Sequence, residues 1–170
     1  SAQPFMVMEQ TPSQQNWQPY NSFKRPGVMR LWSYQAVARG ADTVMFFQLR
    51  RSVGACEKYH GAVIEHVGHE NTRVFRETAA LGKELSKLSN TLLDARVKAK
   101  VAIVFDWENR WATELSSGPS KALDYVNEVH KYYAALFGEN IPVDMIGVEE
   151  DLSKYEIVFA PVLYMVKSRY

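Results

Sequence analysis

The sequence predicts an α/β protein whose strands run parallel. Short apolar runs bounded by turn-forming residues alternate with segments of helical periodicity, which is the pattern of βαβ units. This alternation occurs twice, on either side of a polar segment near residue 95. Hydrophobic residues make up 46% of the 170 residues, which is enough for packed cores and argues against disorder. We therefore expect two small domains, over residues 1–95 and 96–170.

The first half is expected to hold two strands and two helices. Each apolar run is short and ends in polar residues, which is typical of a fully buried strand. The helices show apolar residues at i, i+3 and i+4, with Gly40 ending the first of them. Asn71 is the predicted cap of the second helix, and Ser89-Asn90-Thr91 the predicted break after it. The expected elements are strand 5–8, helix 28–39, strand 43–49 and helix 72–88.

The second half repeats the pattern and favours a flavodoxin-like three-layer domain. Such a sheet has about five parallel strands, and three are recognisable here. Ser120 is the expected cap of the helix, and Gly138 its stop. No glycine-rich phosphate loop follows the first strand, so a nucleotide or flavin site is not predicted. The expected elements are strand 101–105, helix 120–137, strand 142–146 and strand 155–161.

Composition excludes several classes of protein. The net charge of +1 argues against a nucleic-acid binder, and no apolar stretch has the length of a membrane span. The single cysteine, Cys56, fits a reducing compartment, so we expect a cytoplasmic protein. Cys56 and the histidines that follow it match no zinc spacing, and neither a metal nor a cofactor is expected. Residues 1–4 lack the features of a signal peptide, and both ends look cut from a longer chain.

Polar residues that could carry chemistry follow the first two strands. Glu9 directly follows the apolar run 5–8, at the strand end where parallel α/β folds keep their active sites. The alternative is an ordinary solvated glutamate. Trp17 is either a platform for a sugar ring or a packing residue. Glu57 and His60 can face one ligand if a helical turn forms between them; the alternative is a solvated loop in which their pairing is incidental. The acidic residues that follow strand 101–105 are interpreted as an interface or a solvated loop, namely Asp106, Glu108 and Glu114.

Several separated motifs resemble the β-galactosidases of glycoside hydrolase family 42, and they occur in the family's order. The resemblance covers essentially the whole chain, and its later part is similar to the start of that family's trimerisation domain. The motifs are Met8-Glu9-Gln10-Thr11-Pro12, Asn16-Trp17, Pro26-Gly27-Val28-Met29-Arg30-Leu31-Trp32, Gly40-Ala41-Asp42-Thr43-Val44, Glu57-Lys58-Tyr59-His60-Gly61-Ala62 and Val101-Ala102-Ile103-Val104-Phe105-Asp106.

The resemblance implies the last βα units of a (β/α)8 barrel, followed by part of a flavodoxin-like trimerisation domain. It implies a retaining hydrolase of terminal β-D-galactosides, trimeric in the parent protein. Glu9 is then the nucleophile, ionised and held by hydrogen-bond donors. Trp17 and Phe47 would line the sugar pocket, and Glu57 and His60 would bind galactose hydroxyls.

The sequence also departs from the family. The family's acid/base glutamate lies in an Asn-Glu pair after the fourth barrel strand, and this chain corresponds to the seventh strand onward. We therefore expect the isolated chain to be inactive and its open sheet to self-associate. An alternative to an enzyme is a non-catalytic oligomerisation or interaction module based on residues 101–170. A third alternative is a flavin or nucleotide binder. The absence of a glycine-rich phosphate loop after strand 101–105 argues against it.

Overall fold

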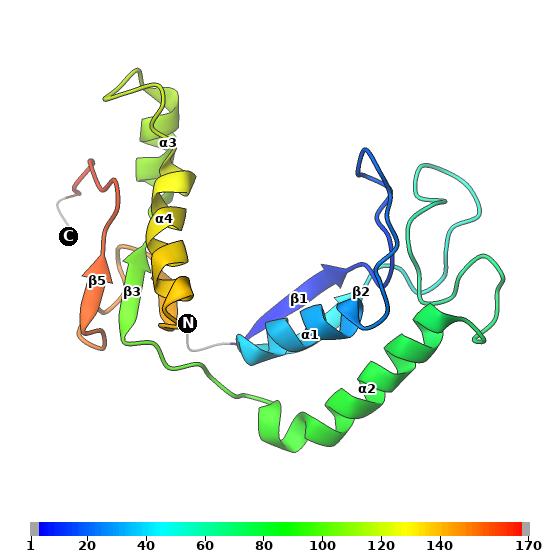
Figure 1. Ribbon diagram of the computed structural model, residues 1–170. Coiled ribbons are helices and arrows are strands. Elements are labelled where there is room, and N and C mark those ends of the chain that lie inside the picture. Colours follow the sequence, from blue (N-terminus) through cyan, green and yellow to red (C-terminus); the bar gives the residue numbers. More distant parts are fainter. Residues whose placement is uncertain (1–3, 168–170) are drawn as a thin grey trace. The chain divides into compact units, whose positions relative to one another are not determined.

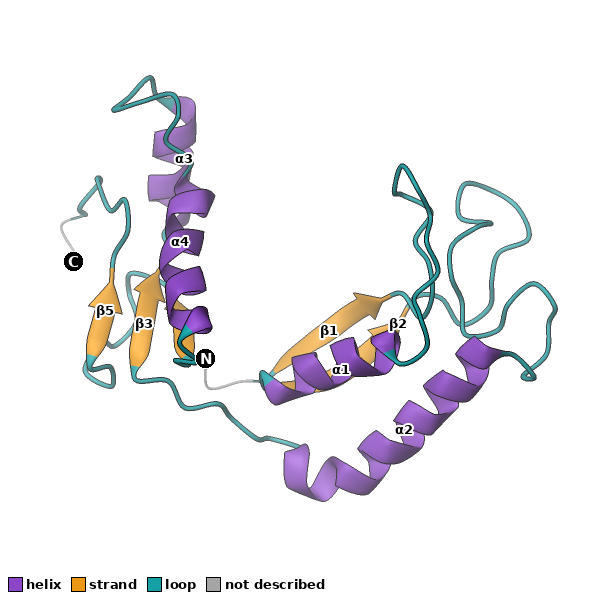
Figure 2. Ribbon diagram, in the orientation of Figure 1, coloured by secondary structure: helices purple, strands orange, loops and turns teal. Residues whose placement is uncertain are grey.

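The computed structural model describes residues 4–167. The chain divides into two compact units, residues 1–97 and 98–170, which are described separately below. Both contain parallel strands and helices, so the predicted α/β class is confirmed (Figures 1 and 2). The elements are β1 Phe5–Gln10, α1 Val28–Ala38, β2 Ala41–Phe46, α2 Arg73–Leu92, β3 Val101–Val104, α3 Trp107–Leu115, α4 Tyr125–Gly138, β4 Val143–Ile146 and β5 Ile157–Phe159.

In the first unit, β1 and β2 form a parallel pair that α1 connects. Helix α1 begins after Gly27, whose φ of 80° is a backbone conformation that favours glycine. Met29 and Ser33 on α1 are buried. The Gln10 side chain donates hydrogen bonds to the Met29 carbonyl (3.3 Å) and to the Ser33 hydroxyl (3.1 Å). The carboxyl end of β1 is therefore held against α1.

The prediction that β1 is fully buried is wrong. Phe5, Met6 and Met8 are 45%, 49% and 68% exposed. Within residues 4–167, β2 is the one strand that pairs with β1, so side chains on both faces of β1 stay accessible. The apolar run is typical of a buried strand, but its burial needs surfaces that these residues do not provide. The expectation that the isolated chain self-associates is based on an open apolar strand of this kind.

Helix α2 differs from its prediction at both ends. Its N-cap is Thr72, whose hydroxyl accepts a hydrogen bond from the Phe75 amide (3.2 Å), and Asn71 instead accepts from Arg76. The helix continues through Ser89-Asn90-Thr91 to Leu92 because these residues disfavour a helix only weakly, unlike glycine or proline. Although α2 has 20 residues, no helix within residues 4–167 is long and apolar enough to cross a membrane.

The second unit is built on a three-stranded parallel sheet in the order β4-β3-β5. All four residues of β3 are buried, because β3 has a neighbour on each side and apolar clusters on both faces. On one face Ile103 packs with Tyr125 and Val129 of α4. On the other face Ala102 and Val104 pack with residues of β4 and β5 and the loops beside them. The core of this unit therefore centres on β3.

Two helix starts in this unit were mispredicted. Helix α3 was not predicted at all, although Asp106 caps it by accepting a hydrogen bond from the Asn109 amide (3.2 Å). Helix α4 was expected to begin after Ser120 but begins after Asp124, which accepts from the Asn127 amide (3.0 Å). The Ser120 hydroxyl accepts from an amide two residues on, which closes a turn and not the helix. Both aspartates have the residue type that caps helices.

Asp106 is buried, so its interpretation as part of a solvated loop or interface is wrong, whereas Glu108 and Glu114 are exposed. Burial favours a higher pKa for Asp106, but hydrogen bonds from Asn109 and the nearby Lys167 ammonium outweigh it and hold the pKa below its ordinary value. The Asn109 amide also donates to the Met165 carbonyl (3.0 Å) and accepts from the Met165 amide (2.7 Å). Asp106 and Asn109 thus fasten the segment around Met165 to α3.

We expect Asp106→Ala to cost about 1–2 kcal/mol of unfolding free energy, as for a strong N-cap. Asp124→Ala removes the cap of α4 at an exposed site and is the matched control, with a smaller loss expected. The pKa of Asp106 is lower in the folded state than in the unfolded state. The ionised carboxylate therefore adds to the free energy of unfolding at pH values above its unfolded pKa, and this addition is lost as the pH falls through its folded pKa. Urea unfolding of both variants at neutral and acidic pH tests this; equal losses at both pH values would contradict it.

Candidate active site

The ends of β1 and β2 lie beside each other, as the predicted βαβ unit requires. Gln10 pairs with Phe46, and the Phe47 amide donates a hydrogen bond to the Gln10 carbonyl (3.1 Å). Glu9 is the residue before Gln10 in β1, and Phe47 directly follows β2. The chain segments that leave the two strands therefore start from one edge of the sheet (Figure 1).

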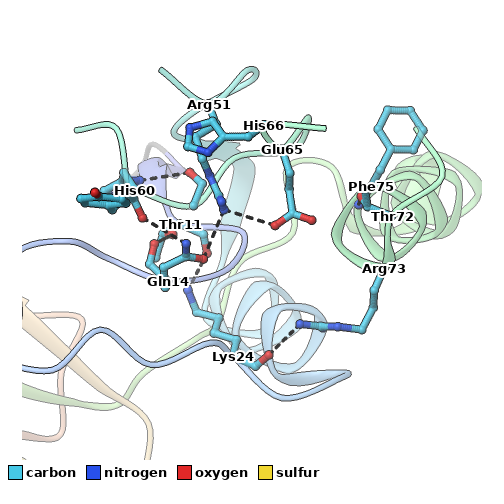
Figure 3. A network of polar contacts seen from close by, with 12 residues as sticks. Thr11, Gln14, Lys24, Arg51, His60, Glu65, His66, Thr72, Arg73 and Phe75 are labelled. Atoms are coloured by element: carbon cyan, nitrogen blue, oxygen red, sulfur yellow. Dashed lines mark hydrogen bonds and ion pairs between the residues drawn. The ribbon is translucent and has the colours of Figure 1, made fainter. Parts of the chain in front are cut away.

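A buried and mostly polar run, Thr11-Pro12-Ser13-Gln14, directly follows β1. The Gln14 carbonyl accepts from the Gly61 amide (2.8 Å) and from the Thr11 hydroxyl (2.9 Å). The Gln14 side chain donates to the Tyr59 carbonyl (3.0 Å). The Thr11 hydroxyl and the Gln14 groups thus have partners, whereas the buried Ser13 hydroxyl has none within residues 4–167. Gln14 is thus the residue that joins the two loops (Figure 3).

The contact at Gly61 leaves no room for a side chain. A Cβ at this position would lie 2.9 Å from both the nitrogen and the carbonyl oxygen of Gln14, and 3.1 Å from Ser13 Cβ. Two of these three neighbours are backbone atoms, which cannot rotate away. The approach of the two loops therefore depends on glycine at position 61.

An aromatic cluster forms around His60, which is 1% exposed. Its ring centroid lies 5.1 Å from that of Phe47 and 6.2 Å from that of Trp17. His60 Nδ1 lies 3.1 Å from the Gly61 carbonyl oxygen. A carbonyl only accepts, so Nδ1 carries a proton, and in the tautomer that is protonated on Nδ1 alone Nε2 is an acceptor. The structure thus brings together three of the five predicted site residues, and Trp17 remains 58% exposed.

The two predicted carboxylates have no partner in the described part of the chain. A turn does form between Glu57 and His60, with the His60 amide donating to the Glu57 carbonyl (2.9 Å). No residue from 4 to 167 donates a hydrogen bond to the side chain of Glu57 or of Glu9, and Glu9 is exposed. The expectation that donors hold Glu9 is therefore not met within these residues, because β1 has a neighbour on one side alone.

Charged side chains that were not predicted as site residues connect these loops (Figure 3). The Arg51 guanidinium, 10% exposed, lies 3.2 Å from Glu65 and donates to the Gln14 side chain at 3.4 Å. Lys24 donates to the Thr11 carbonyl, and partial burial lowers the pKa of Lys24 to about 8. The Lys24 carbonyl accepts from Arg73 at the start of α2 (3.0 Å).

Within residues 4–167, no three His, Cys, Asp or Glu side chains are grouped so that they could hold a metal ion. Cys56 is exposed, and its carbonyl accepts a hydrogen bond from the Asn16 side chain. His66 and His69 each contact a nearby backbone group instead of each other. The side chains that do come together are the rings of Trp17, Phe47 and His60, in the segments that follow β1 and β2.

Two family models match the chain. The model of the β-galactosidases of glycoside hydrolase family 42 matches residues 1–88, and the model of the β-galactosidase trimerisation domain matches residues 99–170. The chain therefore falls among the glycoside hydrolases.

Similar proteins agree with these matches. The chain is 83% identical over 167 residues to β-galactosidase BgaA of Planococcus sp. (strain 'SOS Orange'), covering 98% of this chain and 25% of that protein. It is 55% identical over 165 residues to β-galactosidase LacZ of Lactobacillus acidophilus, covering 97% of this chain and 25% of that protein. The solved β-galactosidase of Bacillus circulans sp. alkalophilus superposes with a TM-score of 0.93 at 80% identity, over 98% of this chain and 25% of that chain.

A catalytic mutant of Gan42B, a family 42 β-galactosidase of G. stearothermophilus, superposes with a TM-score of 0.92 at 41% identity, over 99% of this chain and 25% of that chain. The chain belongs to glycoside hydrolase family 42, the β-galactosidases. It spans about a quarter of the length of the curated relatives that it matches.

Proposed function

We propose that this chain supplies the nucleophile and part of the sugar pocket of a retaining β-galactosidase. The observation that supports this best is the grouping of Trp17, Phe47 and His60 at the sheet edge where Glu9 lies. Aromatic faces suit the C–H faces of a pyranose ring, and a carboxylate beside them suits attack on its anomeric carbon. Membership of family 42 supports the same reading.

In the proposed mechanism, the Glu9 carboxylate attacks the anomeric carbon of a terminal β-D-galactoside. The bond to the leaving oxygen breaks while a second carboxyl group, roughly 5–5.5 Å from Glu9, protonates that oxygen. Water activated by the second group then attacks the galactosyl ester, which releases galactose with its configuration retained. Exposure of Glu9 is compatible with this role, because a nucleophile must reach its substrate.

The other site residues bind the sugar in this proposal. His60 Nε2 accepts a hydrogen bond from a galactose hydroxyl, because Nδ1 is committed to the Gly61 carbonyl. The Glu57 carboxylate accepts from a second hydroxyl and has no competing partner within residues 4–167. Trp17 and Phe47, whose rings both lie next to His60, line the pocket.

The proposal also assigns each half of the chain to a fold within the α/β class. Residues 1–95 are taken as the last βα units of a (β/α)8 barrel, and residues 96–170 as the first part of a flavodoxin-like trimerisation domain. The parallel pair β1-β2 and the parallel order β4-β3-β5 support these assignments. The single cysteine supports the cytoplasm, a reducing compartment, as the location.

The isolated chain is proposed to be inactive. The resemblance assigns no acid/base carboxyl to it, and losing leaving-group protonation costs about 10²–10⁴-fold in rate. Two strands also cannot close a barrel, so the chain carries one part of the sugar pocket and not the whole of it. Nitrophenyl-galactoside turnover by the 170-residue chain and by its Glu9→Gln variant tests this. Robust turnover that the substitution abolishes would contradict the proposed inactivity.

Galactose binding tests the proposed pocket separately from catalysis. We expect His60→Ala to weaken galactose binding to the chain about tenfold, the effect of one lost hydrogen bond of roughly 1.4 kcal/mol. His66→Ala is the matched control, because His66 is an exposed histidine of the same loop. A calorimetric titration in which both variants bind galactose equally well would remove His60 from the pocket.

A second function, oligomerisation, is favoured by the match of residues 99–170 to a trimerisation domain. In this proposal the second unit joins copies of the parent protein into a trimer, while the first unit carries the sugar site. The two functions belong to different units, so they are compatible within one parent protein.

A further inference from the structure

Gln14 holds the residues on both sides of His60. The Gln14 amide nitrogen donates a hydrogen bond to the Tyr59 carbonyl (3.0 Å), and the Gln14 carbonyl accepts one from the Gly61 amide (2.8 Å). Gln14 is 7% exposed and His60 is 1% exposed, so water competes little for these groups. Both bonds therefore restrict the stretch of backbone from which the His60 ring projects.

Arg51 determines the orientation of the Gln14 amide. A guanidinium only donates and a carbonyl only accepts. The Gln14 side-chain oxygen accepts from Arg51 Nη2 (3.4 Å), which leaves the amide nitrogen to face the Tyr59 carbonyl. The same Arg51 nitrogen lies 3.2 Å from a Glu65 oxygen, and the Arg51 side chain is 10% exposed (Figure 3). An amide turned by half a rotation would oppose donor to donor and acceptor to acceptor, so one orientation is favoured.

Backbone pairing fixes the positions of Arg51 and Glu65. The Ile64 amide donates to the Leu49 carbonyl (2.7 Å), and the Ile64 carbonyl accepts from the Arg51 amide (2.9 Å). Glu65 is the next residue after Ile64, so the two charged side chains start from neighbouring points of a paired backbone. The group that orients the Gln14 amide is thus anchored in the paired segment after β2.

We propose that Gln14, oriented by Arg51, is a positioning residue that places His60 to bind a sugar hydroxyl. The inference rests on the proposed role of His60 in the sugar pocket and adds the contacts that place its ring. His60 Nδ1 donates to the Gly61 carbonyl (3.1 Å), so the position of residue 61 sets the direction in which Nε2 faces. Gln14 and Arg51 do not contact the sugar, and they act through His60.

A positioning role and a purely structural role of Gln14 lead to different kinetics. If Gln14 only stabilised the fold, its loss would lower the fraction of active enzyme and leave KM unchanged. If Gln14 positions His60, its loss weakens a contact that the sugar makes in the ground state and in the transition state alike. KM then rises while kcat changes little. The effect must also vanish when the His60 side chain is absent.

The kinetic test uses a chimera in which this chain replaces the matching 167-residue segment of Planococcus BgaA, to which it is 83% identical. Gln14→Met keeps the length of the side chain and removes its amide. We expect it to raise KM for nitrophenyl-galactoside about tenfold, as for loss of one hydrogen bond to the sugar, with kcat within about threefold. Gln15→Met is the matched control, because Gln15 is exposed, and it should change neither constant.

Two further variants connect the effect to His60. In the His60→Ala background, Gln14→Met should raise KM by less than about twofold, because the group that Gln14 positions is gone. Gln14→Glu keeps an oxygen for Arg51 but presents a second oxygen, and no donor, to the Tyr59 carbonyl. It should raise KM at least as much as Gln14→Met.

A second measurement needs neither catalysis nor sugar. Nitrogen-15 spectra of the 170-residue chain at alkaline pH report which ring nitrogen of a neutral histidine carries the proton. His60 is the one of the four histidines whose signal His60→Ala removes. We expect His60 to be protonated on Nδ1 in the original chain and in Gln15→Met. Gln14→Met and Gln14→Glu should each give a mixture of the two tautomers, because the Gly61 carbonyl is no longer held in place.

Three outcomes would overturn the proposal. An unchanged KM in Gln14→Met, with fewer active molecules, would leave Gln14 a purely structural role. An equal rise in KM with and without the His60 side chain would mean that Gln14 acts on another group. A His60 tautomer that neither Gln14 variant changes would mean that Gln14 does not place the ring. Failure of the proposed sugar pocket is recognised separately, because His60→Ala alone would then leave KM unchanged.

Discussion

Glu9→Gln is expected to lower kcat by about 10⁴-fold or more in an active enzyme that contains this chain, as for loss of other catalytic nucleophiles. The enzyme to use is a chimera in which this chain replaces the matching 167-residue segment of Planococcus BgaA, which is 83% identical to it. Glutamine keeps the size of the side chain but cannot attack the anomeric carbon. Nitrophenyl-galactoside turnover of the chimera and its variant provides the measurement.

Two controls test whether the loss of turnover is specific to Glu9 and to its role as the nucleophile. Glu70→Gln removes an exposed carboxylate from the loop after β2 and should leave turnover unchanged. Glu9→Ala with added azide should form the α-galactosyl azide, because azide then attacks the face that Glu9 occupies, whereas loss of an acid/base would yield the β-azide. A Glu9→Gln chimera that retains more than a tenth of its activity would exclude Glu9 as the nucleophile.

Gly61→Ala should destabilise the first unit by about 2–3 kcal/mol, the cost of forcing a methyl group into a packed site. The new Cβ would lie 2.9 Å from two backbone atoms of Gln14, so the loops after β1 and β2 must separate. That separation also breaks the hydrogen bond between the Gly61 amide and the Gln14 carbonyl. Urea unfolding of the 170-residue chain measures the loss.

Gly54→Ala is the control for this substitution. A Cβ at position 54 meets no atom within 4 Å, and Gly54 lies in the same long loop. We expect this variant to unfold within about 0.5 kcal/mol of the original chain. If Gly61→Ala were as stable as Gly54→Ala, the close contact at Gln14 would not be what holds the two loops together.

The strands and most helices could be predicted because their signals are local. The apolar runs that became β2, β3 and β4 are bounded by turn residues, and the periodicity of α1 is visible in its own sequence. Helix α3 was missed because its cap, Asp106, was interpreted as one of three acidic residues. The end of α2 was misplaced because Ser89-Asn90-Thr91 resembles a break yet disfavours a helix only weakly.

Part of the candidate site was also predictable. Trp17, Phe47 and His60 were proposed from their positions after strands and from resemblance, and their rings do lie together. The Arg51–Glu65 pair and the contacts of Gln14 were not foreseen as support for these loops. Arg51 and Glu65 are 14 residues apart in an irregular loop, where no periodicity indicates which side chains meet.

From its sequence alone, this chain is a parallel α/β protein of family 42 with Glu9 at the end of its first strand. Those features are determined locally, by the alternation of apolar and polar residues and by short motifs. Tertiary structure alone decided that Gly61 must be glycine, that His60 donates through Nδ1, and that β1 and the two tryptophans of α3 are exposed. Burial and close contact depend on which distant surfaces meet, and no local pattern carries that information.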